Sequence, residues 1–346
     1  MKSLTITSTR TAAGKTTVGL GIALNTKLKC GFYKPYGDHL VYSKKNLHDL
    51  DAMVFHNWLG MDNIVLESTL GFDADKIISH WNHKELDSVL KRNYEAVRAK
   101  HDLTIVETAR NYSFGGHMDM DSISLAQKFD SEILLVAEGD VSLILDKVLA
   151  IAKCAENIAK FKGIVINKVS EEDWDKVKIE VPPVLERKGI KLLGMLPKHP
   201  ELEWGHMRLV LEKLNAKLIA GGDGIGKVVK TVQVGALSAE QAMKMPNFFR
   251  ENKVLITGGD RIDLIYACLA PETAGIVLTN NILPHPKVIA KADDMDIPIL
   301  SVHMDTYSTA KAVEKIIAEI SPDEVDKREL IKNMAKKELD LDAILA

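Results

Sequence analysis

The segment STRTAAGKTT, residues 8–17, contains the residue types of a loop that binds nucleotide phosphates. Such a loop needs backbone N–H groups that face phosphate oxygens, a lysine that reaches the β- and γ-phosphates, and a hydroxyl group for Mg²⁺ at the start of a helix. Gly14, Lys15 and Thr16 supply the last part of this pattern, whereas Thr9 stands in place of its first glycine. We predict that the loop binds ATP, with Lys15 as a catalytic residue; the expected contacts are Thr9, Thr11, Ala12, Ala13, Gly14, Lys15, Thr16 and Thr17.

Two acidic residues are candidates for a metal site beside this loop. Glu107 ends the apolar run LTIVE (103–107), and Asp51 lies within the helical pattern at 47–59. Magnesium in nucleotide sites is held by one or two carboxylates together with phosphate oxygens. The sequence therefore predicts that Thr16, Asp51 and Glu107 bind Mg²⁺. The alternative for both acids is a carboxylate on the molecular surface.

Two further polar residues stand at the ends of apolar runs. Lys34 lies near the end of CGFYKP (30–35), where a compact positive charge would stabilise a transferred phosphoryl or carboxylate group. Asn167 ends GIVIN (163–167), and its amide offers both a donor and an acceptor to the edge of adenine. We predict these two roles; an exposed lysine and a strand-end cap remain the alternatives.

These residues need a fold that brings the ends of separate strands together. Continuous apolar runs alternate with helical patterns along residues 1–205, which predicts an α/β domain with a mostly parallel sheet buried on both faces. A second α/β pattern starts at 253–259 and includes a helix expected over 306–320. We predict a smaller second domain over 206–346, with the charged C-terminal helix as part of it.

The composition favours a soluble globular protein of the cytoplasm. Of 346 residues, 46% are hydrophobic and 27% are charged, and the net charge is −3. Because no basic excess is present, nucleic acid is not an expected partner. The three separated cysteines predict neither a disulfide framework nor a zinc site. No apolar run approaches the roughly 20 residues of a membrane helix, so we expect no membrane partner.

The loop and five later segments resemble dethiobiotin synthetase and the cobyrinate-type amidoligases. The similar segments are GFYKPYGD (31–38), DLDAM (49–53), LTIVETA (103–109), GIVINKV (163–169) and LLGMLPKHPEL (192–202). The resemblance implies a P-loop NTPase fold with ATP and Mg²⁺ as cofactors. It also implies that Asn167 reads the adenine and that Pro197 lies in the segment that closes the nucleotide site.

Two departures from that family concern catalysis. After Glu107 the chain reads Thr108-Ala109-Arg110-Asn111, where the family's ligases have glycines, and this implies a changed acceptor pocket. Arg10 lies four residues before Gly14, where MinD-like relatives carry a lysine that crosses to the γ-phosphate of a partner subunit. We predict that Arg10 is catalytic and acts within a homodimer; an exposed loop arginine is the alternative.

The second domain resembles the DRTGG domain. The resemblance is carried by VLITGGDRIDLIYACL (254–269), whose Asp260-Arg261 pair matches the start of that motif, while the later turn reads Thr279-Asn280-Asn281. It implies the architecture of the front part of long phosphotransacetylases and a small-molecule or nucleotide ligand at this domain.

Two functions are consistent with these resemblances. One is a nucleotide-dependent regulatory module, a slow ATPase whose state is read by a partner enzyme. The other is an ATP-dependent ligase that activates a small carboxylate or carbamate by phosphorylation. The glycine-poor run after Glu107 favours the first, and the retained set Lys15, Thr16, Lys34, Asp51 and Glu107 favours the second.

Overall fold

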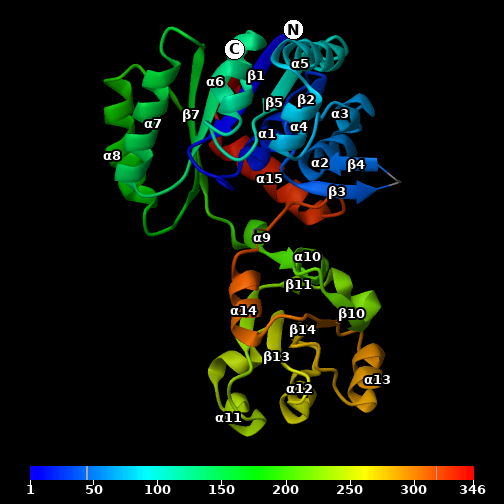
Figure 1. Cartoon of the computed structure of the whole chain (residues 1–346). Coiled ribbons are helices and arrows are strands. Elements are labelled where there is room, and N and C mark those ends of the chain that lie inside the picture. The colour runs from blue at the N-terminus through cyan, green and yellow to red at the C-terminus, as the bar shows by residue number, and fades with distance from the viewer. Residues whose placement is uncertain (44–45, 317) are drawn as a thin grey trace. The chain divides into compact units, whose positions relative to one another are not determined.

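The computed structural model describes residues 1–43, 46–316 and 318–346 and divides into two compact units (Figure 1). The first unit comprises Met1–His199 together with Ile320–Ala346, and the second comprises Pro200–Glu319. Each unit has its own sheet, and the two are described in turn.

The first unit is built on a parallel sheet with the strand order β2-β5-β1-β6-β7-β8. Its strands are the apolar runs of the sequence and are buried along most of their length, which confirms the predicted α/β fold with a mostly parallel sheet. Their bounds are β1 Lys2–Ser8, β2 Cys30–Tyr33, β5 Leu103–Glu107, β6 Glu132–Ala137, β7 Phe161–Val169 and β8 Leu192–Pro197.

Helices cover both faces of this sheet. On one face, α5 and α6 share a core with Tyr33 and Val106, and α7 and α8 cover β6 and β7. On the opposite face, α1 lies so close to the sheet that Gly19 faces Ile6 and Ile105. The helices are α1 Lys15–Leu24, α2 Leu50–Leu59, α3 Ile64–Glu67, α4 Ala74–His80, α5 His83–Arg98, η1 Gly116–Met118, α6 Ser122–Lys128, α7 Val141–Ala155 and α8 Trp174–Glu186.

The position of β1 in the sheet fixes where a site can form. From β1 the chain passes through α1 to β2 on one side, whereas the later strands β6, β7 and β8 follow on the other side. In open parallel sheets, ligands bind outside the carboxyl ends of the strands at such a point of reversal. A small hairpin, β3 Leu40–Ser43 and β4 Asn46–Asp49, precedes α2 near this edge.

The second unit contains a smaller sheet with the order β10-β15-β14-β13-β12, parallel except for β10. Residue 317 of the expected helix over 306–320 lies outside the described residues, and α14 is assigned to Thr306–Glu314. The strands are β9 Gly205–His206, β10 Lys217–Ala220, β11 Val228–Val229, β12 Thr231–Val234, β13 Lys253–Gly258, β14 Thr273–Thr279 and β15 Ile299–Ser301; the helices are α9 Pro200–Glu203, α10 Met207–Lys213, η2 Gly222–Gly226, α11 Ala239–Met243, η3 Pro246–Phe249, α12 Ile262–Cys268, α13 Pro286–Asp294 and α14.

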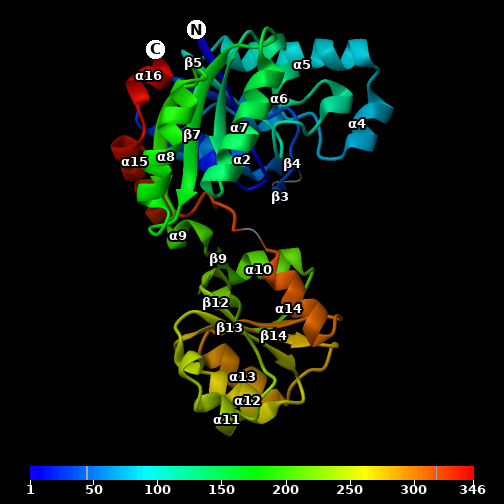
Figure 2. The ribbon, with the colours of Figure 1, turned by 90° about the vertical axis from the view of Figure 1, so that its left-hand side faces the viewer.

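The C-terminal segment corrects the expected domain boundary of 206–346. Helices α15 Val325–Glu338 and α16 Leu341–Leu345 belong to the first unit (Figure 2). There α15 packs along α1 (Figure 1). The apolar face of α15, including Ile331 and Ala335, is buried there. The Asp340 N–H also donates to the Leu193 carbonyl at 2.8 Å, which ties the segment to β8. The helix therefore joins the first unit because that unit offers the matching apolar surface.

The close approach of α1 and α15 gives a testable prediction. A Cβ atom at Gly21 would lie 2.5 Å from the Cβ of Ala335. Gly21→Val should therefore lower the stability of the first unit by about 1–3 kcal/mol through overpacking, measured as a lower thermal unfolding temperature. Gly226→Ala is the control, because its added Cβ meets no atom within 4 Å. An unchanged melting temperature for Gly21→Val would contradict this packing.

Candidate functional site

The loop between β1 and α1 contains two residues with left-handed backbone conformation. Gly14 adopts φ 93° immediately before α1, and Ala12 has φ 61°. The Thr9 N–H donates to the Val136 carbonyl at 3.0 Å, which joins the start of the loop to β6. Thr11 is exposed on the loop, while Ala13 is buried beneath it. The loop therefore forms although its first glycine is replaced.

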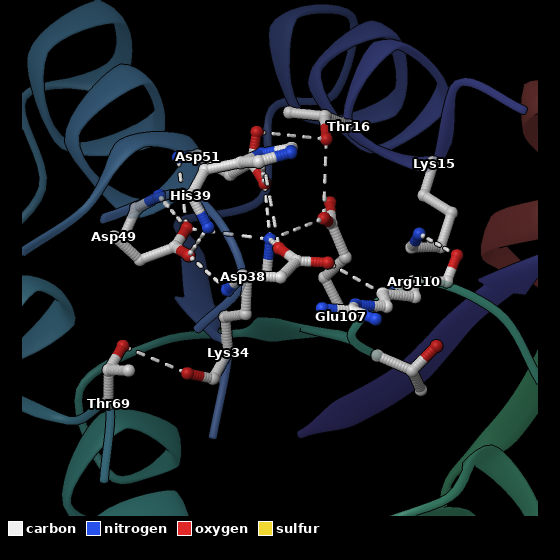
Figure 3. A network of polar contacts seen from close by, with 12 residues as sticks. Lys15, Thr16, Lys34, Asp38, His39, Asp49, Asp51, Thr69, Glu107 and Arg110 are labelled. Carbon is white, nitrogen blue, oxygen red and sulfur yellow. Dashed lines mark hydrogen bonds and ion pairs between the residues drawn. The ribbon is translucent and has the colours of Figure 1, made fainter. Parts of the chain in front are cut away.

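The three predicted metal ligands lie together at the start of α1. The Thr16 hydroxyl is 3.1 Å from Asp51 Oδ1 and 3.2 Å from Glu107 Oε1 (Figure 3). These side chains come from the first turns of α1 and α2 and from the end of β5. The second carboxylate oxygen of Glu107 is buried without a hydrogen-bond partner. The donor set is therefore suited to Mg²⁺, and the metal role of these residues stays a prediction.

Lys15 is buried and makes a contact within the chain at the place where phosphate would be expected. Its Nζ donates to the Arg110 carbonyl at 2.8 Å. Arg110 adopts φ 45°, and its N–H donates to Asp38 Oδ2 at 2.7 Å. Burial lowers the pKa of Lys15, an effect opposed by the charge of Glu107. The run after Glu107 that departs from the glycine-rich pattern thus supplies a carbonyl partner for the loop lysine.

Lys34 lies inside a cluster of acidic side chains and is 1% exposed. Its Nζ forms an ion pair with Asp51 Oδ2 and lies 2.5 Å from Asp38 Oδ1. Glu107 Oε1 and Asp49 Oδ1 follow at 3.4 and 3.5 Å. The positive charge predicted to act on a transferred group is therefore surrounded by carboxylates of its own chain (Figure 3).

Burial and charge pairing shift the pKa values of the residues in this cluster in different directions. Burial alone would lower the pKa of Lys34, but the carboxylates, Asp51 first, raise it well above its usual value. Although burial favours the neutral acid, Lys34 holds the pKa of Asp51 well below its usual range. Burial and the negative charge of Asp51 raise the pKa of Glu107 to about 8. Burial opposes protonation of His39, yet Asp51 raises its pKa to about 9.

Asp38, His39 and Asp49 belong to the site but were not singled out from the sequence. Asp49 caps α2: its Oδ1 accepts from the Asp51 N–H at 3.0 Å, and its Oδ2 accepts from the N–H of Asp38 at 3.1 Å and of His39 at 3.3 Å. An aspartate directly before a helical pattern is a typical cap, and this signal was available for Asp49. The sequence carries no comparable signal for Asp38 and His39. They approach α2 only because the hairpin β3–β4 folds back between them and that helix.

The remaining predicted residues are placed less centrally. Arg10 is half exposed, with its guanidinium 3.7 Å from Glu138 Oε1. Thr17 is half-buried in the first turn of α1. Pro197 ends β8 and is paired in register with Val169 of β7. Their roles in catalysis or nucleotide binding stay predictions.

Asn167 is in direct contact with the loop. Its Nδ2 donates to the Ala13 carbonyl at 2.8 Å, and a Cβ atom on Gly14 would lie 2.0 Å from that nitrogen. One amide hydrogen of Asn167 is therefore used in the hydrogen bond to the Ala13 carbonyl of the loop. The contact of the other polar atoms of this side chain with adenine stays a prediction.

Replacing Asn167 separates these two roles. Asn167→Ala should weaken ATP binding about 2- to 10-fold, because the lost hydrogen bond contributes roughly 0.5–1.5 kcal/mol. If Asn167 also reads the base, the preference for ATP over GTP should narrow in calorimetric titrations, with the exposed Asn57→Ala as control. Unchanged affinities for ATP and GTP would contradict both the loop contact and the adenine contact. An equal loss of affinity for ATP and GTP would contradict the adenine contact alone.

In the second unit, Arg261 of the Asp260-Arg261 pair contacts the backbone of its own chain. The Arg261 guanidinium donates to the carbonyls of Gly235 at 3.3 Å and Leu237 at 2.5 Å. It thereby holds the segment after β12, and a ligand at this unit stays a prediction.

Family models match most of the chain. The AAA domain model matches residues 2–206, and the DRTGG domain model matches residues 209–316. Among curated proteins, the phosphate acetyltransferase of Pseudomonas putida is 23% identical, with 98% of this chain and 51% of that protein covered. The phosphate acetyltransferase of Nitratidesulfovibrio vulgaris is 25% identical, with 93% and 48% covered. The chain thus spans about half the length of the curated relatives it matches.

Two solved structures match parts of the chain. The Pyrococcus furiosus cell division ATPase MinD is 17% identical, with a TM-score of 0.38 and coverage of 58% of this chain and 85% of that one. A Clostridium perfringens pyrophosphatase regulatory region with CBS and DRTGG domains, complexed with the activator diadenosine tetraphosphate, is 12% identical, with a TM-score of 0.27 and coverage of 44% and 73%. Within the described residues, none of the helices has the length and apolar character needed to span a bilayer.

Proposed function

Because the chain belongs to the AAA domain family and carries a DRTGG domain, we propose that it binds Mg·ATP and acts as a nucleotide-dependent regulatory module related to phosphate acetyltransferases. The observation that carries this proposal is the convergence of Thr16, Asp51 and Glu107 beside the loop lysine. We further propose slow ATP hydrolysis in the cytoplasm, a homodimer in which Arg10 reaches the nucleotide of the second copy, and a small-molecule or nucleotide ligand at the second unit.

The residues present fit a magnesium ion. Thr16, Asp51 and Glu107 would hold it, and the unpartnered Glu107 oxygen is an acceptor that a cation would satisfy. When bound, the ion supplies positive charge that neutralises phosphate oxygens. The chain itself supplies the loop amides and the Lys15 ammonium group.

A regulatory role needs a part of the chain that differs between nucleotide states. We expect nucleotide binding to draw the Lys15 ammonium group, which has three N–H donors, toward the phosphates and so to lengthen its 2.8 Å contact with the Arg110 carbonyl. Arg110 also stacks on Phe114, at 4.4 Å from the guanidinium carbon to the ring centroid. We propose that the segment around these two residues changes with the nucleotide and presents that change to a partner enzyme.

The ligase function has weaker support. It requires Lys34 to direct its charge at a phosphoryl or carboxylate group of the substrate. Four carboxylates already surround that charge, and an anionic acceptor would meet them first. The retained phosphate loop is compatible with both functions and does not favour this one.

One set of measurements tests the proposal and separates the two functions. ADP release is followed for the purified chain alone, with a panel of small carboxylates and bicarbonate, and with candidate partner enzymes such as a phosphate acetyltransferase. Hydrogen exchange of residues 108–116 is compared with and without Mg·ATP. We expect faster exchange with nucleotide and ADP release that carboxylates do not change. Carboxylate-stimulated ADP release would instead identify a ligase, and the absence of ATP binding would overturn both.

A further inference from the structure

Arg110 has a backbone conformation that glycine adopts more easily. Its φ is 45°, in the left-handed region where a residue with a Cβ atom is strained. It lies three residues after Glu107, the last residue of β5, at the edge of the sheet where the phosphate loop begins. Strained residues of this kind cluster at functional sites and persist where their surroundings fix them. The side chain of Arg110 is therefore a candidate for a role that glycine could not fill.

Three hydrogen bonds fix the backbone of Arg110 beside the phosphate loop. Its carbonyl accepts from Lys15 Nζ at 2.8 Å and from the Ser8 hydroxyl at 3.2 Å. Its N–H donates to Asp38 Oδ2 at 2.7 Å, so that Arg110 lies between Lys15 and Asp38 (Figure 3). The lysine of such a loop reaches the β- and γ-phosphates. Arg110 is therefore next to the expected position of the terminal phosphate.

The guanidinium group of Arg110 is exposed and lies over the Phe114 ring, at 4.4 Å from the ring centroid. Among the residues that the structure describes, no carboxylate forms an ion pair with it. Other basic side chains of this edge already have acidic neighbours: four carboxylates surround Lys34, and Arg10 is 3.7 Å from Glu138 Oε1. The charge of Arg110 is thus available to an anion that binds beside Lys15.

We propose that Arg110 contacts the γ-phosphate of bound ATP and thereby distinguishes ATP from ADP. The inference rests on the proposed function, and it names the part of the nucleotide that the segment around Arg110 and Phe114 reads. When ATP binds, the guanidinium group leaves the Phe114 ring for oxygens of the terminal phosphate, which match its forked N–H donors. With ADP this partner is absent and Arg110 stays on Phe114. A regulatory module needs such a difference, because a contact made equally in both states shifts no equilibrium.

Arg110→Gly isolates the side chain from the backbone contacts. The variant keeps the carbonyl and N–H of this position, and glycine suits the positive φ, so the fold should be retained. Calorimetry on the full chain measures the affinities for Mg·ADP and for the magnesium complex of the β,γ-imido analogue of ATP, which is not hydrolysed. We expect the variant to bind the analogue about tenfold more weakly than wild type, because a charge-assisted contact to phosphate is lost, and to bind Mg·ADP equally well. The control, Arg92→Ala, removes an exposed arginine of α5 and should change neither affinity.

The two affinities separate this inference from the proposed function. An unchanged affinity for the analogue in Arg110→Gly, or an equal loss for the analogue and for ADP, would overturn the contact with the γ-phosphate. A wild-type chain that binds the two nucleotides equally would also overturn it, while the proposed nucleotide site would stand. A wild-type chain that binds neither would overturn both. If Arg110→Gly does not fold, Arg110→Asn, whose side chain also tolerates a positive φ, is measured in its place with the same expectations.

Discussion

Lys15→Ala is expected to lower the affinity for Mg·ATP about 10- to 100-fold, because a charge-assisted hydrogen bond to phosphate contributes roughly 1.5–3 kcal/mol and the buried phosphate would keep no ammonium partner. Lys15 is positioned for this role at the start of α1, directly after Gly14 with its left-handed φ of 93°. Isothermal titration calorimetry with Mg·ATP measures the loss.

The control for this variant is Lys27→Ala, which removes an exposed lysine of the same unit. It should leave the affinity unchanged. In Lys15→Ala the Arg110 carbonyl also loses its 2.8 Å donor, so exchange of residues 108–116 should already be fast without nucleotide. Wild-type affinity in Lys15→Ala would show that the loop is not the phosphate site, and slow exchange there would remove Arg110 from the proposed switch.

The approach of Thr16 and Glu107 was predictable from sequence because each follows a clear signal, whereas Asp51, which lies on α2, was predicted from the family resemblance of residues 49–53. Thr16 belongs to the loop pattern, and Glu107 ends a continuous apolar strand. The carboxyl ends of parallel strands meet at one edge of a sheet, so residues at those ends approach each other whatever their separation in sequence. The same reasoning located Asn167, although its contact with the Ala13 carbonyl depends on loop geometry that the pattern does not specify.

The surroundings of Lys34 and the place of the C-terminal helix were not predictable in this way. Asp38 and His39 reach Asp51 through a hairpin whose register the sequence does not determine. The periodicity of α15 indicates an apolar face, but it does not say which surface covers that face. The partner, Gly21, is more than 300 residues away, and a glycine in a helix gives no sign of a close contact until the two elements are placed together.

Glu107→Gln is expected to stabilise the nucleotide-free chain at high pH. Burial raises the pKa of Glu107 to about 8 from 4.5. Between these values the folded chain keeps a proton that the unfolded chain has released, so the free energy of unfolding falls as the pH rises through this interval. Glutamine cannot ionise and avoids the loss. Above pH 8 the variant should be more stable by about 2–5 kcal/mol, with little difference below pH 4.5.

The same variant should bind Mg·ATP about tenfold or more weakly, because one full negative charge beside the metal is lost. Unfolding temperatures between pH 4.5 and 9 and calorimetric titrations with Mg·ATP measure the two effects, and the exposed Glu67→Gln should change neither. A gain in stability combined with a loss of binding identifies Glu107 as a carboxylate kept for function at a cost to folding. If Glu107→Gln destabilises the chain at pH 9, Glu107 is instead a structural member of the Lys34 cluster, and the magnesium assignment loses its main support.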